Sequence, residues 1–257
     1  MKILVCVKQC FDPESRIVVQ DGAIQEAGLR IAINPYDAVA LTQAAKVRKA
    51  GVADELVAVT VGEDVKDTTL RHALAIGADR AIFAKTTGEL DEQRVVAILA
   101  DIARQEKPDL IMAGHLSSDN SSSQVPSRLA QELGVPSITM ASSMEVGPDY
   151  VEGVHEFEDG EATSRVALPA LVSAQVYMSQ AHYVAMKSLM MAKKKKVDTI
   201  EYPAAPAKLH VLNYETPPAR TPGRRIKDEP EACATEILSW MESSTGVSVK
   251  EQGEGDR

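Results

Sequence analysis

The chain has 257 residues, of which 44% are hydrophobic and 25% charged, and its formal net charge is -9. This length and composition suit a packed globular domain, and the acidic balance argues against a general nucleic-acid binder. Three scattered cysteines predict neither a disulfide framework nor a thiolate metal site. We expect a cytoplasmic protein, because no apolar run approaches the ~20 residues of a membrane span and no signal peptide is recognisable.

The first 141 residues alternate apolar strand-like runs with helical segments. A hairpin is expected around Asp21-Gly22. The alternation predicts βαβ units and an α/β fold with a doubly wound, mostly parallel, Rossmann-like sheet. Strands are expected at 3–7, 56–61, 80–84, 109–113 and 137–141, and helices at 34–50, 64–76, 91–105 and 121–133.

The pattern changes in the second half of the chain. An antiparallel meander is expected at about 142–168, after which 171–176 returns to the main sheet. We assign 1–200 to the α/β domain. Prolines predict that 201–257 is an extended arm, with a short helix at 230–241 and a disordered tail. Such an arm either embraces a partner or folds back on its own domain.

A Ser- and Asn-rich loop at 113–125 follows the fourth long strand. In open α/β sheets, ligands bind outside the carboxyl ends of strands, and a helix N-terminus presents free N–H groups to an anion. The segments 7–9, 61–63 and 34–37 are expected at the same edge. Together they predict a crevice for an adenine and a ribose, although a plain Ser-rich helix cap has the same composition.

Several nucleotide and catalytic motifs are absent. The chain has no Walker loop, no G-x-G-x-x-G after a strand and no G-x-S-x-G elbow. The 114–125 loop contains no Lys or Arg, which disfavours an enzyme that uses ATP on a related fold. A nucleotide-sensing module without redox work remains an alternative.

Four consecutive lysines at 193–196 follow a Met-rich segment. A cationic run is usually a solvated surface. Flexible Met side chains, however, suit a surface that adapts to several partners, and nearby lysines can steer an acidic partner.

Short segments in a fixed order and spacing resemble the β subunit of electron transfer flavoproteins, from residue 1 to about 241. Singly they are weak, but together they are specific. The segments are Cys6-Val7-Lys8-Gln9, Asn34-Pro35-Tyr36-Asp37, Leu74-Ala75-Ile76-Gly77-Ala78-Asp79, Pro108-Asp109-Leu110-Ile111, Leu168-Pro169-Ala170, Ala192 to Lys196 and Pro217 to Thr221.

The resemblance implies a heterodimer whose α subunit holds the redox-active FAD, so this chain would be an electron carrier subunit without bond-making chemistry. It also implies an adenine nucleotide in this subunit and a recognition loop, about 182–196, that docks a flavin-containing dehydrogenase such as an acyl-CoA dehydrogenase. The expected nucleotide pocket comprises Lys8, Asn34, Val61, Gly62, Gly114, Asp119, Ser122, Ser123, Gln124 and Val125. The expected partner-binding residues are Met186, Leu189, Met190, Lys193 and Lys194.

The chain departs from the family pattern around the expected phosphate contacts. Of the usual Gln-Ala-Ile-Asp loop only Asp119 is kept, Pro126 stands where Gly is frequent, and Glu156 replaces a common basic residue. Ordinary members hold AMP and bifurcating members a second FAD in the same place. The segments 6–9, 34–37 and 124–125 look like the bifurcating kind, whereas 91–96 looks more like the AMP kind. We favour AMP, with a second FAD as the alternative.

Overall fold

The computed structural model describes residues 1–180 and 184–245. The chain divides into two units, Met1–Glu215 and Thr216–Arg257. Residues 182–183 of the expected recognition loop lie outside the described residues, as does the part of the expected disordered tail from 246 onward. No helix among the described residues is long and apolar enough to cross a bilayer.

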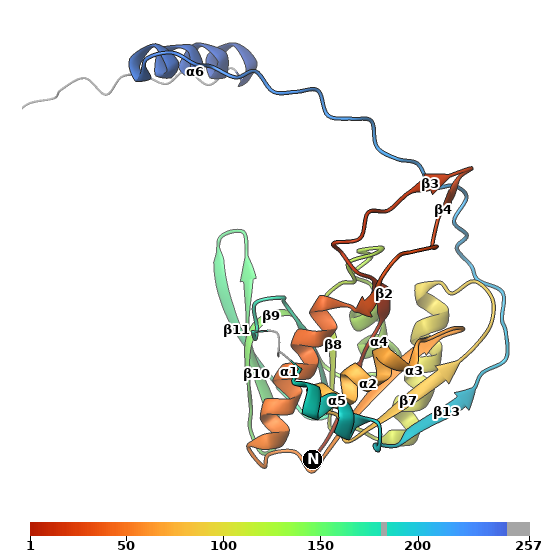
Figure 1. The fold of residues 1–257 in the computed structure, drawn as a ribbon. Helices are drawn as coiled ribbons and strands as arrows, with labels where there is room; N and C mark the ends of the chain where they lie inside the picture. Colours follow the sequence, from red (N-terminus) through yellow and green to blue (C-terminus); the bar gives the residue numbers. More distant parts are fainter. Residues whose placement is uncertain (181–183, 246–257) are drawn as a thin grey trace, which may run out of the picture. The chain divides into compact units, whose positions relative to one another are not determined.

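The first unit is built on a nine-stranded sheet (Figure 1) with the order β11-β10-β9-β12-β8-β1-β6-β7-β13. Strands from β12 to β13 run parallel, whereas β9, β10 and β11 pair antiparallel. This confirms the predicted doubly wound α/β class. The strands are β1 (Lys2–Cys6), β6 (Glu55–Gly62), β7 (Arg80–Lys85), β8 (Leu110–Gly114), β9 (Ser137–Val146), β10 (Tyr150–Phe157), β11 (Gly160–Ala167), β12 (Ala170–Ala174) and β13 (Val197–Glu201).

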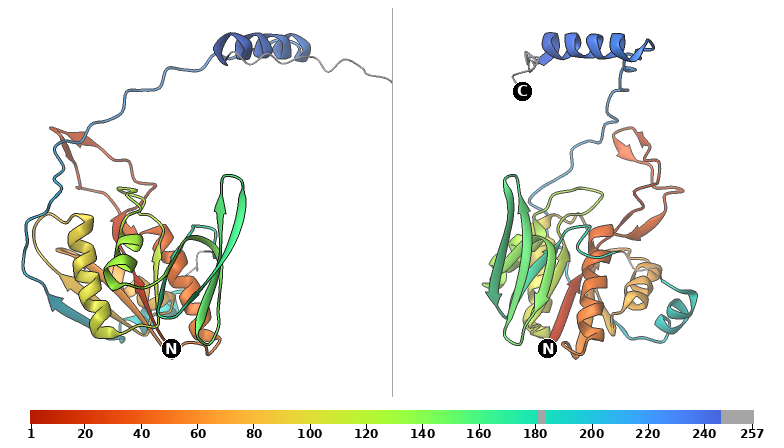
Figure 2. Two further views of the ribbon diagram at one scale, coloured as in Figure 1. Left: turned by 180° about the vertical axis from the view of Figure 1, so that it is seen from behind. Right: turned by 90° about the vertical axis from the view of Figure 1, so that its left-hand side faces the viewer.

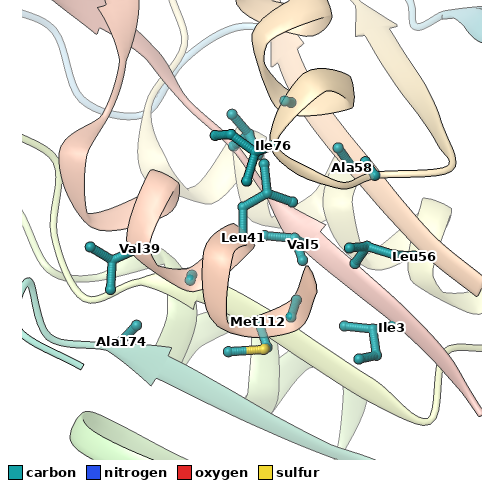
Figure 3. Packing of buried hydrophobic residues seen from close by; sticks show 14 of the residues in the cluster. Ile3, Val5, Val39, Leu41, Leu56, Ala58, Ile76, Met112 and Ala174 are labelled. Atoms are coloured by element: carbon teal, nitrogen blue, oxygen red, sulfur yellow. The ribbon is translucent and has the colours of Figure 1, made fainter. Parts of the chain in front are cut away.

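Helices cover both faces of the parallel part of the sheet (Figure 2) because its strands are apolar on both sides. Ile3 and Val5 of β1 pack into one cluster with α1 and α2, shown in Figure 3. Leu4, which points the other way, packs into a second cluster with α3 and α4. The helices of this unit are α1 (Pro35–Lys49), α2 (Asp67–Ile76), α3 (Glu92–Glu106), α4 (Val125–Leu133) and α5 (Met186–Ala192).

Several predicted boundaries were wrong, among them the start of α2, which begins at Asp67 rather than at residue 64. The strand expected at 137–141 and the first part of the meander expected from about 142 form the single strand β9, which continues past an irregularity at Met140 (φ +57°). The meander therefore extends the main sheet. Helix α4 begins at Val125 rather than Ser121, because Ser121 and Ser123 adopt left-handed φ values of +52° and +54°. Left-handed residues cannot continue a right-handed helix.

Short elements complete the first unit. The expected hairpin forms as β3 (Val19–Gln20) and β4 (Ala23–Ile24) around Asp21 and Gly22, both with positive φ. Strands β2 (Gln9–Phe11) and β5 (Ile31–Ile33) pair antiparallel and were not predicted, nor were α5 and β13. In the second unit, α6 (Pro230–Thr245) begins at the predicted residue and runs past the predicted end at 241.

Candidate functional site

A cavity of about 350 Å³ lies at the carboxyl ends of β1, β6 and β8 and beside the N-termini of α1, α3 and α4. The crossover rule for parallel sheets places loops from all these elements at one edge. Asp119 is absent from its wall but lies next to it, bonded to Lys8. The other nine residues expected in the nucleotide pocket line this crevice: Lys8, Asn34, Val61, Gly62, Gly114, Ser122, Ser123, Gln124 and Val125.

Asp37, in the first turn of α1, ties the crevice together. Its carboxylate is buried and accepts the backbone N–H of Lys8 at 2.7 Å and of Gly114 at 2.8 Å. It thereby joins the end of β1 to the end of β8. Burial raises the pKa of this carboxyl from 3.8 to about 6, against the lowering effect of the two N–H donors. Sequence reasoning included Asp37 in a crevice segment but did not single it out.

Gly114 and Asn34 shape the crevice rather than presenting free polar groups to it. A Cβ on Gly114 would lie 2.8 Å from the backbone nitrogen of Asp37, so no larger residue fits there. The Asn34 side chain is buried, donates to the Leu116 carbonyl at 2.8 Å and accepts the Ser118 N–H at 3.2 Å. Both ends of this amide therefore hold the loop that follows β8.

Lys8 is the only lysine or arginine among the described residues of the crevice wall. Its ammonium donates to Asp119 at 2.7 Å and to the Ser117 hydroxyl at 3.2 Å. Burial works to raise the pKa of Asp119, but the hydrogen bonds from Lys8 and Ser117 and the positive charge of Lys8 together outweigh it and lower that pKa. Burial also lowers the pKa of His115, another wall residue. The crevice therefore offers no uncompensated cation.

The N-terminus of α4 adds backbone donors to the polar side chains of the crevice wall. Ser123 is left-handed (φ +54°) and Gln124 right-handed (φ -95°, ψ -34°). This alternation turns successive N–H groups into a concave anion-binding nest, and the helix dipole adds partial positive charge. The Gln124 side chain does not cap the helix. The arrangement suits a phosphate group.

Helix α5 carries the expected partner-binding residues, and the structure separates them. Met186 and Met190 are 73% and 66% exposed, whereas Leu189 packs against the core. Lys193 and Lys194 are exposed. Lys195 differs from its neighbours because its ammonium is bonded to backbone carbonyls of α2 and the loop after it. The tetralysine is therefore not a uniform cationic patch.

The described residues contain no group of His, Cys, Asp and Glu arranged to hold a metal ion. Cys6 and Cys10 are buried free thiols beside the crevice, and burial raises the pKa of both. Thiols of this kind are poor nucleophiles. The chemical features of the site are therefore the uncapped N-terminus of α4 and apolar wall residues such as Val59, Val61 and Leu99.

The family model of the electron transfer flavoprotein domain matches residues 21–205. The β subunit of the electron transfer flavoprotein of Syntrophomonas wolfei is 42% identical over 250 residues, covering 97% of this chain and 99% of that protein. The chain belongs to the electron transfer flavoprotein family, as a β subunit. The β subunit from Bacillus subtilis is 31% identical, and that from Bradyrhizobium diazoefficiens 32%, each covering 96% of this chain and all of the relative.

Family membership confirms the resemblance found in the short motifs and gives the chain a role in electron transfer by a flavoprotein. Sequence reasoning did not identify three of the residues that organise the two regions. Asp37 and Lys195 bond to backbone groups far away in the sequence, and Arg71 divides its bonds between such carbonyls and the side chain of Asp67, four residues earlier. An acid in the first turn of a helix that borders the crevice was the one available signal, and it pointed to Asp37.

Proposed function

We propose that this chain is the β subunit of a heterodimeric electron carrier, with AMP in the crevice and the redox-active FAD in an α subunit. The observation that carries the nucleotide part is the uncapped nest at Ser123–Gln124, on the wall of a cavity at the sheet edge. FAD would supply the redox chemistry. This chain would bind the nucleotide, support the flavin subunit and dock the donor dehydrogenase.

The shape and charge of the crevice favour a mononucleotide. Its volume of about 350 Å³ is near the lower end of the roughly 300–1,000 Å³ typical of small-molecule sites. A second FAD contains an AMP moiety plus a flavin mononucleotide and needs considerably more room. The crevice wall includes the acidic residues Glu63, Asp64 and Glu92, which would repel the negative charge of a triphosphate. Lys8, the one lysine in the described part of the wall, would not offset this repulsion, because it is already paired with Asp119.

The deciding experiment is the cofactor content of the purified heterodimer, released by denaturation and quantified per complex. One FAD and one AMP would support the proposal. Two FAD and no AMP would show that the crevice holds a second FAD instead of AMP. One FAD and no other nucleotide would refute the crevice as a nucleotide-binding site.

A single substitution tests the phosphate nest. Gln124→Glu places a carboxylate at the N-terminus of α4, where it competes with a phosphate. We expect AMP to be lost and FAD retained. Gln131→Glu, an exposed position near the other end of the same helix, is the matched control and should leave both unchanged.

The docking part of the proposal rests on the exposed methionines of α5. Apolar, adaptable side chains beside lysines suit a partner with an apolar cleft in an acidic surface. Met186→Glu should slow reduction by the donor dehydrogenase while FAD and AMP contents stay unchanged. Val52→Glu adds the same charge at another exposed apolar position, in the turn after α1, and serves as control. Identical transfer kinetics in Met186→Glu and wild type would refute the docking surface.

A further inference from the structure

Helix α5 is too short to set its own orientation. It has seven residues, and its N-cap, Ala185, offers no side-chain hydrogen bond. Isolated helices below about 12 residues are marginal in water. The direction in which Met186 and Met190 project must therefore be fixed by contacts with the rest of the fold.

Lys195 makes one such contact, just after α5 ends. Its ammonium donates to the carbonyl of Leu74 at 2.9 Å and to that of Ala78 at 2.6 Å. Leu74 is in the last turn of α2 and Ala78 follows it, so the cation meets carbonyls at a helix C-terminus, where they lack helical partners. Burial lowers the pKa of Lys195, and Asp79 opposes this effect. Lys193, Lys194 and Lys196 are exposed.

Arg71 makes the reciprocal contact from α2. Its guanidinium donates to the carbonyl of Ala192 at 3.1 Å and to that of Lys195 at 2.9 Å. Ala192, the last residue of α5, is buried in the core. The C-terminal end of α5 is thus held by four hydrogen bonds from two cations. On the other side, Lys46 of α1 donates to Ser179, ahead of α5, at 2.7 Å.

We propose that Lys195 and Arg71 are positioning residues that set the orientation of α5 for the donor dehydrogenase. The tetralysine then has two functions: Lys195 anchors the helix internally, while Lys193 and Lys194 face the partner. The proposal rests on the docking role proposed for α5. It predicts that removing the internal lysine impairs recognition more than removing an exposed one, although each change deletes one positive charge.

The test compares Lys195→Met with Lys194→Met in the complete heterodimer, using an acyl-CoA dehydrogenase as donor. Lys195→Met should raise the KM for the donor roughly tenfold, equivalent to about 1.4 kcal/mol, and leave kcat at saturating donor unchanged. Reduction of the flavin by dithionite, which needs no docking, should also be unchanged. Lys194→Met should raise KM less than about threefold at physiological salt. Lys195→Arg, which keeps charge and donors, should restore most of the wild-type KM.

Equal KM values in Lys195→Met and Lys194→Met would overturn the positioning role, because charge alone would then account for both. A normal KM in Lys195→Met together with a raised KM in Met186→Glu would refute positioning but keep docking. A normal KM in both would refute docking itself. Arg71→Met removes the hydrogen bonds that α2 donates to the end of α5, and it therefore tests the proposal even if the Lys195→Met heterodimer does not assemble. A wild-type KM in the assembled Arg71→Met heterodimer would overturn the proposal.

Discussion

The crevice and helix α5 are both held by polar anchors, but the anchors differ in burial. Asp37 and Asn34 at the crevice are nearly inaccessible to solvent and bond to backbone groups of neighbouring loops. The outer side chains of α5 are exposed, and Lys195 and Arg71, which hold it, are only partly buried. Removing one partner of a buried polar pair leaves the other unsatisfied. We therefore expect substitutions at the crevice to lower stability, and substitutions at α5 to impair recognition of the donor.

The largest effect is expected at Gly114. Gly114→Val would drive a side chain to within 2.8 Å of the Asp37 nitrogen and 2.4 Å of its carboxylate, so α1 must separate from β8. We expect a loss of about 3 kcal/mol or more in the free energy of unfolding, together with loss of AMP. Urea unfolding and nucleotide analysis measure both.

Gly223→Val is the control for this substitution, because a Cβ there meets no atom within 4 Å. A Gly114→Val protein as stable as wild type would show that the crevice tolerates movement of α1. The contrast between buried and exposed anchors would then be wrong.

The second effect is a pH dependence at Asp37. Because burial raises its pKa from 3.8 to about 6, the native state holds more protons at this carboxyl than the unfolded chain does between those values. The stability contributed by this group therefore falls as pH rises through that window and is constant above it. The change is on the order of 3 kcal/mol, since the pKa moves by about two units and one pKa unit is about 1.4 kcal/mol.

Asp37→Asn isolates this group, because the asparagine does not titrate and the other carboxyls cancel in the difference. The unfolding free energy of wild type minus that of Asp37→Asn should be larger at pH 4.5 than at pH 7.5. The reverse trend would mean that the two N–H donors outweigh burial and that the carboxylate is the stabilised form.

Gly114 and Asp37 also show how much of the site could be predicted from the sequence alone. The strand and helix alternation predicted the parallel sheet, because buried strands and amphipathic helices leave distinct periodic patterns. The rule for ligands at strand ends then predicted that Lys8, Val61 and Gly114 would meet. The partners of Asp37 were not predictable, because they are backbone N–H groups 29 and 77 residues away and leave no trace in composition.

The second half of the first unit was harder to predict for a similar reason. Strand β13 lies at the sheet edge and, within the described part of the chain, pairs with β7 alone, more than a hundred residues earlier. Its residues are half-buried or exposed, so no apolar run marks it. The Ser-rich loop before α4 suggested a helix cap, whereas Ser121 and Ser123 adopt left-handed φ values that its composition does not reveal. A local sequence pattern therefore does not predict an element such as β13, whose position depends on pairing with a strand far away in the sequence.

A smaller effect, of opposite sign, is expected at Thr60 on β6. Its side chain is buried, and its hydroxyl has no hydrogen-bond partner among the described residues. Thr60→Val removes this unsatisfied group with little change in shape and should raise the free energy of unfolding by about 1 kcal/mol. Val59→Thr, which places a hydroxyl at the adjacent buried position, should lower it. Destabilisation by Thr60→Val would reveal a partner for the hydroxyl, such as a buried water molecule.

The smallest effect is expected from the exposed lysines after α5. Lys193→Gln and Lys194→Gln each remove one solvent-exposed charge, so each should slow association with an acidic donor less than about threefold at low salt. The difference from wild type should vanish in about 1 M salt, where the Debye length is about 3 Å. By contrast, the slower reduction of Lys195→Met should persist in about 1 M salt, because it comes from a displaced α5 rather than from a weaker electrostatic attraction to the donor. Stopped-flow reduction at two salt concentrations therefore separates an anchor from a steering charge within one run of four lysines.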